Sequence, residues 1–248
     1  MCLIVFAWRP EHGQPLIVAA NRDEFYTRPT QALGRWPETQ VHAGRDLEAG
    51  GTWLGVGANG RFAALTNIRR PGQLIGSRSR GELVAQFLAG EMSAEGYAAE
   101  VSQRSAEYTG FNLLLRDGQR LAYVSSATPD PVWLPAGVYG LSNAGLDTAW
   151  PKLTKTRSAM AAGLDDYSIP GLLELLADAR PAPTAELPDT GVGQATETLL
   201  SSVFIASPNY GTRASTVVVM GEDGTAQMVE RSFGVNGVPI GEVRLVTP

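Results

Sequence analysis

The amino-acid sequence predicts an α+β fold in which helices cover mainly antiparallel sheets. Strand-like hydrophobic runs occur at both ends of the chain and in its middle, and segments with helical spacing separate them. Strands and helices do not alternate strictly, so a doubly wound parallel sheet fits the order less well. The length of 248 residues fits one large domain, and we expect residues 1–248 to form a single domain.

The first predicted elements are two buried strands joined as a hairpin. Residues 2–8 read CLIVFAW and residues 16–20 read LIVAA, and a turn with two prolines separates them. β-branched and aromatic residues favour strands. A hairpin of matching strands would bring the segment NRDE, residues 21–24, back beside Cys2.

The middle of the chain begins with a segment of little periodicity, residues 25–50, which we expect to be irregular. A second hairpin is predicted from strands at 52–57 and 61–67, because Asn59 followed by Gly60 is a strong signal for a tight turn. Apolar residues at spacings of three and four predict a helix over 79–90, and a second helix is expected after Ser93.

The sequence of the second half of the chain predicts both strands and helices. The sequence favours strands at 111–115, 121–125 and 137–141, helices at 151–162 and 170–177, a proline-rich surface loop at 181–193, and strands at 202–206, 215–220 and 226–232.

Composition excludes several functions and suggests a compartment. The net charge of −5 argues against a nucleic-acid partner, and the only two histidines, His12 and His42, are too few for a metal site of ordinary ligand type. A lone cysteine cannot form an internal disulfide, which fits a reducing compartment. No apolar stretch approaches the roughly 18–20 residues of a membrane span, and no basic segment precedes the first apolar run as in a secretory signal. We therefore expect a cytoplasmic protein with no membrane span.

Three short motifs suggest chemistry that their surroundings do not support. Residues 55–60 match the dinucleotide pattern GxGxxG, but a strand rather than a helix is expected to follow. Residues 140–144 resemble a serine nucleophile elbow, but no histidine follows to act as its base. The basic pairs Arg69-Arg70 and Arg78-Arg80 could receive an anionic substrate tail, but a solvated surface is the favoured interpretation.

The second residue of the chain can by itself form a catalytic unit. Removal of Met1 would leave Cys2 with a thiol and a free α-amine. An α-amine has an ordinary pKa of about 7.7–8.0, so it can act as a general base at neutral pH. A nucleophile and its base then come from one residue, and no histidine is needed. The alternative is that Cys2 is a small buried hydrophobe.

Polar neighbours favour the catalytic interpretation. Asp23 could hold the α-amine, and Arg22 could lower the pKa of the thiol. Adjacent residues of a strand point to opposite faces, so both can reach Cys2 only if the strand bends or ends there. A solvated turn with an internal ion pair is the alternative.

Several motifs in one order give the sequence a resemblance to a known family. They are the Met-Cys start, NRDE at 21–24, GGTWLG at 50–55, TNIR at 66–69, GFNL at 110–113, Ser142-Asn143 and YGTRASTV at 210–217. The chain resembles the NRDE-motif family, also called the transport-and-Golgi-organisation-two family, over nearly its whole length.

That family is in turn similar to the N-terminal-nucleophile hydrolases of the penicillin V acylase and bile salt hydrolase branch. The resemblance implies a four-layer αββα sandwich with Cys2 as nucleophile and base. It implies that Arg22 and Asp23 orient and polarise the thiol, and that Arg213 completes the polar cluster. It also implies that Asn143 stabilises the oxyanion, together with either Asn67 or a backbone N–H. We place Asn21 of the same motif with Asn67 as a substrate-binding candidate.

Two hypotheses about function follow. The first is an N-terminal cysteine hydrolase or acyltransferase that acts on a non-peptide amide or thioester bond of a small acyl substrate and needs no cofactor. The alternative is a non-catalytic carrier of haem, lipid or acyl-CoA, or a trafficking protein, that uses the same fold. The substrate and the oligomeric state are left open by the sequence.

Overall fold

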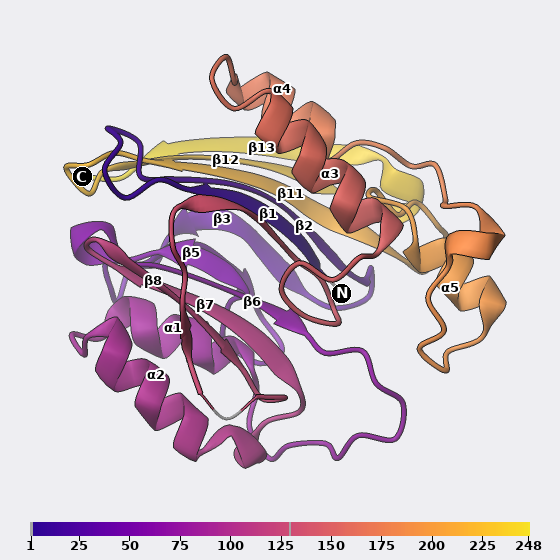
Figure 1. The fold of residues 1–248 in the computed structure, drawn as a ribbon, viewed down its shortest axis with the longest axis horizontal. Coiled ribbons are helices and arrows are strands. Elements are labelled where there is room, and N and C mark those ends of the chain that lie inside the picture. The colour runs from indigo at the N-terminus through magenta and orange to yellow at the C-terminus, as the bar shows by residue number, and fades with distance from the viewer. Residues whose placement is uncertain (1, 129) are drawn as a thin grey trace.

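Two β-sheets are stacked face to face between two layers of helices (Figure 1). The computed structural model describes residues 2–128 and 130–248. The six-stranded sheet has the order β10-β1-β2-β11-β12-β13, and the seven-stranded sheet has the order β3-β4-β5-β6-β7-β8-β9. Neighbouring strands pair antiparallel in both sheets. The predicted α+β class and αββα sandwich are confirmed.

The six-stranded sheet contains the N-terminal hairpin. Its strands are β1 (Cys2–Trp8), β2 (Leu16–Phe25), β10 (Gly137–Leu141), β11 (Tyr210–Met220), β12 (Ala226–Phe233) and β13 (Pro239–Val246). β1 is apolar throughout because both of its faces are buried. Ile4 and Phe6 pack in the core between the sheets, whereas Leu3 and Val5 pack in the core under the helices.

The seven-stranded sheet forms the opposite wall of the central core. Its strands are β3 (Thr30–Arg35), β4 (His42–Asp46), β5 (Leu54–Val56), β6 (Phe62–Asn67), β7 (Phe111–Asp117), β8 (Arg120–Ser125) and β9 (Val132–Trp133). Between β5 and β6, Asn59 and Gly60 have φ angles of 56° and 66°. Asparagine and glycine tolerate this left-handed region best, which confirms the predicted hairpin.

Helices cover the outer face of each sheet. α1 (Gly81–Ala89) and α2 (Ala94–Gln103) pack on the seven-stranded sheet, and α3 (Pro151–Ala162) and α4 (Ile169–Leu175) pack on the six-stranded sheet. A fifth helix, α5 (Gln194–Leu200), follows α4 in the sequence and lies to one side of the layers (Figure 1). None of the helices in the described part of the chain is long and apolar enough to cross a membrane.

Four details of the sequence-based prediction are wrong. Residues 25–50 contain strands β3 and β4: β3 is mostly exposed or half-exposed, and the short β4 is buried over its first three residues, so neither shows a regular apolar alternation. Residues 202–206 are not a strand, and the preceding helix α5 and the last strand β13 were not predicted. β13 is an exposed edge strand, so it lacks the buried apolar pattern on which the prediction relied.

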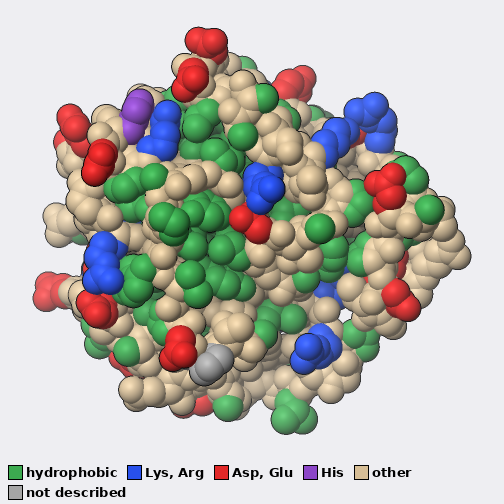
Figure 2. Space-filling model, in the orientation of Figure 1, with side chains coloured by type: hydrophobic (Ala, Val, Ile, Leu, Met, Phe, Trp, Pro, Cys, Tyr) green, Lys and Arg blue, Asp and Glu red, His purple; other side chains and the backbone are tan. Residues whose placement is uncertain are grey.

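Charged side chains of both signs are scattered over the visible surface. Figure 2 shows apolar side chains gathered near the middle of this face, with single Lys and Arg side chains around them. This face therefore lacks the continuous basic patch that is typical of nucleic-acid binding.

Candidate functional site

A cavity of about 140 Å³ lies between the two sheets, and the Cys2 thiol is part of its wall. We call it the Cys2 cavity. Strands β1, β2, β11 and β12 contribute one side, and β3, β4, β6, residues 52–53 and the N-terminus of α1 contribute the other. Cys2 is a free cysteine at the first residue of β1 and is only 6% exposed. The cavity therefore contains the one nucleophilic thiol of the chain.

Arg22 lies directly opposite Cys2 in the β1–β2 pairing. Opposite residues of paired strands project from the same face, so strand geometry directs both side chains into the cavity. Burial raises the pKa of the Cys2 thiol, the Asp23 carboxylate raises it further, and the Arg22 guanidinium lowers it. Removal of Met1 stays a prediction, because Met1 lies outside the described residues.

Asp23 also lines the cavity but is fixed from the neighbouring strand. Thr212 on β11 donates its hydroxyl to Asp23 Oδ1 at 2.8 Å, and the Tyr210 hydroxyl donates to the Asp23 backbone carbonyl at 3.1 Å. The β2–β11 pairing shifts register between Thr212 and Ala214. Burial raises the pKa of Asp23, and the nearby Lys152 lowers it. Adjacent residues Arg22 and Asp23 thus both line the cavity, next to an irregular stretch of the β2–β11 pairing.

The two asparagines predicted to stabilise an oxyanion are in contact with each other. Asn67, the last residue of β6, lines the cavity. Asn143 does not line it, and its side-chain Nδ2 donates to the Asn67 backbone carbonyl at 2.8 Å. The structure thus places Asn67 beside the cavity and Asn143 behind it.

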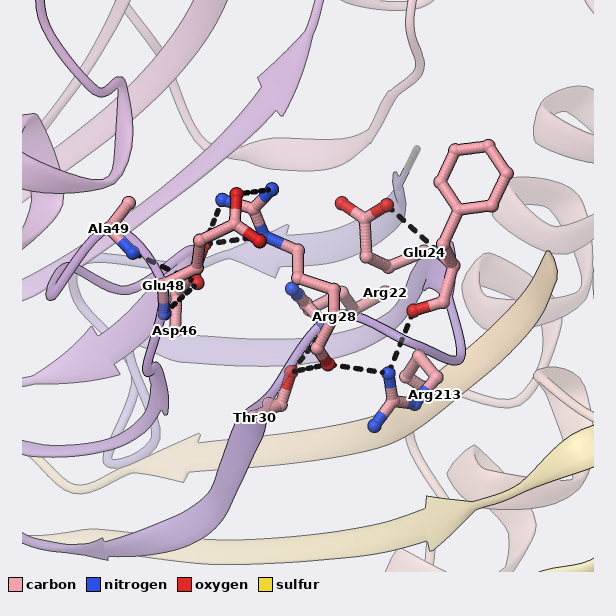
Figure 3. A network of polar contacts seen from close by, with 9 residues as sticks. Arg22, Glu24, Arg28, Thr30, Asp46, Glu48, Ala49 and Arg213 are labelled. Carbon is pink, nitrogen blue, oxygen red and sulfur yellow. Dashed lines mark hydrogen bonds and ion pairs between the residues drawn. The ribbon is translucent and has the colours of Figure 1, made fainter. Parts of the chain in front are cut away.

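Asn21 and Arg213 do not line the Cys2 cavity. Asn21 Nδ2 donates to the backbone carbonyls of Leu176 and Val203, which ties β2 to the helical layer. Arg213 Nη1 donates to the backbone carbonyl of Arg28 (Figure 3). It also donates to the carbonyls of Phe25 and Tyr26, at the end of β2 and in the turn that follows. The hydrogen bonds of Asn21 and Arg213 thus stabilise β2 and the turn after it, which carry several of the residues that line the cavity.

Sequence reasoning missed Lys152, a buried lysine on α3. It is 5% exposed, and burial lowers its pKa while Asp23 raises it. Lys152, Thr156 and Met160 are all buried and recur every four residues, so they share one face of α3. That spacing is the signal that could have identified Lys152 as an inward-facing charge.

The basic pair Arg78-Arg80 divides between two environments. Arg80 lines the Cys2 cavity, whereas Arg78 forms ion pairs with Glu82 and Glu107. His12 and His42 are both outside the cavity lining. Within residues 2–128 and 130–248, no group of three His, Cys, Asp or Glu side chains could hold a metal ion.

Comparison with solved structures identifies the fold. The chain has the fold of the N-terminal-nucleophile hydrolases: it is similar to the C2A mutant of conjugated bile acid hydrolase from Clostridium perfringens, with a TM-score of 0.53, 10% identity, and coverage of 99% of this chain and 92% of that chain.

Sequence comparison then gives the family. The family model described as "Transport and Golgi organisation 2" matches residues 1–234. The chain is 36% identical to the human "Transport and Golgi organization protein 2 homolog" and 37% identical to that of Bos taurus, with 94% of this chain and 93% of each relative covered. The chain therefore belongs to the Transport and Golgi organisation 2 family.

Proposed function

We propose that this protein is an N-terminal cysteine hydrolase or acyltransferase that acts on a non-peptide amide or thioester bond. The observation that carries the proposal is the Cys2 thiol in the wall of a cavity, with Arg22 opposite it and Asp23 beside it. Similarity to a conjugated bile acid hydrolase supports the same class of chemistry.

The reaction requires that Met1 be removed so that Cys2 carries a free α-amine. The thiol sulfur then attacks the carbonyl carbon of the substrate while its proton passes to the α-amine. The C–N or C–S bond breaks, and the leaving amine or thiol takes that proton. Water or an acceptor attacks the resulting thioester at Cys2, and the thiol is restored by the proton that the attacking group loses.

Arg22, Asp23 and Asn67 have separate roles in this scheme. Arg22 stabilises the thiolate that forms during attack, because a nearby cation lowers the pKa of the thiol. Asp23 orients the α-amine and balances its charge. An amide donor from Asn67 would stabilise the oxyanion, an interaction whose loss costs roughly 10²–10³ in kcat in comparable sites. Asn143 positions Asn67 through its hydrogen bond to the Asn67 carbonyl.

The size of the cavity favours a small acyl group. Pockets for drug-sized ligands occupy roughly 300–1,000 Å³, whereas the Cys2 cavity has about 140 Å³. The carrier hypothesis for haem or lipid would place the ligand in a cavity larger than the Cys2 cavity and requires no reaction at Cys2. A cytoplasmic location is proposed with the enzyme, because a reducing compartment keeps a lone thiol unoxidised.

Covalent labelling tests the proposal. Intact mass spectrometry of the purified protein should show loss of Met1, and incubation with a panel of activated acyl thioesters should add one acyl group at Cys2. Cys2→Ala should add none, and Arg78→Gln, a control away from the cavity, should react as the unmodified sequence does.

Two results would contradict the proposed enzymatic function. One is an active protein that retains Met1, which removes the α-amine from the mechanism. The other is a folded protein whose Cys2 accepts no acyl group. A haem titration followed by absorbance would then test the carrier function, with Cys2→Ala beside it to detect a thiolate ligand.

A further inference from the structure

Four arginines line the Cys2 cavity, and they differ in how their charge is balanced. Arg28 pairs with Asp46 and Glu48 (Figure 3). Arg45 pairs with Glu38. In the part of the chain that the structure describes, Arg22 and Arg80 have no carboxylate oxygen within 4.0 Å of their guanidinium nitrogens. Two of the four cations thus lack an ion pair.

Arg22 is the more deeply buried of the two. It is only 7% exposed, and its one side-chain hydrogen bond in the described structure is a long contact of 3.4 Å from Nη1 to Thr30 Oγ1. A guanidinium has five N–H donors. Burying such a cation without a counterion is unfavourable. An anionic ligand that neutralised the charge of Arg22 would therefore bind favourably.

The carboxylates around Arg22 are engaged elsewhere. Glu230 accepts hydrogen bonds from the Leu33 backbone N–H at 2.7 Å and from Thr216 Oγ1 at 3.0 Å. Glu24 accepts from the backbone N–H of Phe25, and Asp23 accepts from Thr212. These carboxylates moderate the positive potential, but none of the three forms an ion pair with Arg22 in the described structure.

Arg80 approaches the same cavity from the seven-stranded side. Its Nη1 donates to the Gly110 carbonyl at 3.2 Å, which leaves its other donors available. Burial lowers its pKa, whereas the neighbouring Cys2 and Glu24 raise it. Ser79, Arg80 and Gly81 stand at the start of α1 and line the cavity, so the positive end of the helix dipole adds to the guanidinium charge.

We propose that Arg22 and Arg80 bind an oxyanion of the substrate, a carboxylate or a phosphate, beside the Cys2 thiol. The site rests on the proposed function in that the anion belongs to the molecule whose acyl group Cys2 receives. A planar guanidinium matches both kinds of oxyanion through paired hydrogen bonds. The two arginines and the Cys2 thiol line one cavity of about 140 Å³. This favours an anion close to the reacting carbonyl, as in a short acidic acyl compound or one with a phosphate near the scissile bond.

Ligand binding to the Cys2→Ala protein tests the site without any turnover. Isothermal titration would compare succinamate, its neutral isostere succinamide, and inorganic phosphate. We expect at least one of the two anions to bind. If the carboxylate is the ligand, succinamide should bind much more weakly than succinamate. Arg80→Met should weaken anion binding about tenfold or more, because it removes a charged hydrogen-bonding partner. Arg80→Lys should recover part of the affinity, because it keeps the charge but not the fork.

The matched control is Arg78→Met, which removes a nearby arginine that is already ion-paired and does not line the cavity. It should leave anion binding unchanged, and thermal unfolding would confirm that both variants fold. Preference for succinamate or for phosphate identifies the source of the oxyanion.

The proposal is overturned if neither anion binds, if succinamide binds as tightly as succinamate while phosphate does not bind, or if Arg80→Met leaves the dissociation constant of the bound anion unchanged. Failure here is distinct from failure of the proposed function, because Cys2→Ala has no thiol to acylate. Conversely, an unreactive Cys2 would leave anion binding by the two arginines intact.

Discussion

At Cys2, strand register decides which charges act on the thiol. Arg22 is its cross-strand partner, and Asp23 reaches the cavity from a strand whose pairing with β11 is irregular. The sequence placed both residues near Cys2 but could not decide between them, because a regular strand would point them to opposite faces. The register shift opposite Asp23 is a property of β11, which lies almost two hundred residues further along the chain.

Opposite effects on thiol reactivity are expected from the two charges. Arg22→Gln should move the pH profile of Cys2 alkylation by iodoacetamide to higher pH, because the cation that lowers the thiol pKa is lost. Asp23→Asn should move it to lower pH, because the carboxylate that raises the thiol pKa is lost. At a fixed neutral pH, the first variant should react several-fold more slowly and the second several-fold faster.

Arg78→Gln again serves as the control and should leave the pH profile of Cys2 alkylation unchanged. If the pH profiles of Arg22→Gln and Asp23→Asn shifted in the same direction, a change of structure rather than of charge would explain the altered reactivity of the thiol. Thermal unfolding of each variant separates these explanations.

At the scale of elements, the loop before β5 positions the start of α1. The Thr52 backbone N–H donates to the Gly81 carbonyl at 3.1 Å. A Cβ on Gly51 would overlap the backbone of Gly81, so only glycine permits this approach. The GGTW segment, residues 50–53, therefore brings Arg80 and the N-terminus of α1 to the cavity.

Replacing the two glycines separates close packing from backbone conformation. Gly51→Ala should lower the free energy of unfolding by about 1–3 kcal/mol through overpacking against α1. Gly50→Ala meets no atom within 4 Å but has a φ of +77°, which should cost about 1 kcal/mol. Urea denaturation measures both.

Anion binding distinguishes the two variants further. Gly51→Ala should also weaken binding to the Cys2 cavity, because it displaces the start of α1, whereas Gly50→Ala should not. Equal effects of both variants on stability and on binding would contradict this account of Gly51.

The elements that the sequence missed share a physical cause. β3 and β13 have exposed or half-exposed side chains, and α5 buries a charge, Glu197, in an ion pair with Arg69. Hydrophobic periodicity reports elements that bury an apolar face, so it carries no signal for elements held by edge pairing or by a buried ion pair. The buried hairpins and the amphipathic helices were predictable because their buried faces require apolar residues at regular spacings.

For the whole molecule, stability depends on the core between the two sheets. Phe6 on β1 is fully buried there, and its ring stacks on Tyr139 of β10 with centroids 5.4 Å apart. The cavity stands at one end of this core, so packing of the sheets holds its two walls at a fixed separation.

Truncation of the core should therefore be costly. Phe6→Ala is expected to lower the free energy of unfolding by about 3–5 kcal/mol, from lost burial and the space left behind. Ile75→Ala, at a position that is 91% exposed, should change it by less than about 0.5 kcal/mol. A Phe6→Ala effect no larger than that of Ile75→Ala, measured by urea denaturation, would show that the sheets do not share one core.

The sequence by itself determined the fold class, the N-terminal hairpin and the residue types at the site, because apolar periodicity and turn residues are local properties. Only the tertiary structure decided which polar residues meet. Cys2, Arg22, Asp23, Asn67 and Arg80 come together because two sheets stack and one helix begins at their edge, whereas Asn21 and Arg213 bond to the backbone around them. Register, a bulge and the close approach at a glycine set these contacts, and each depends on segments far apart in the chain.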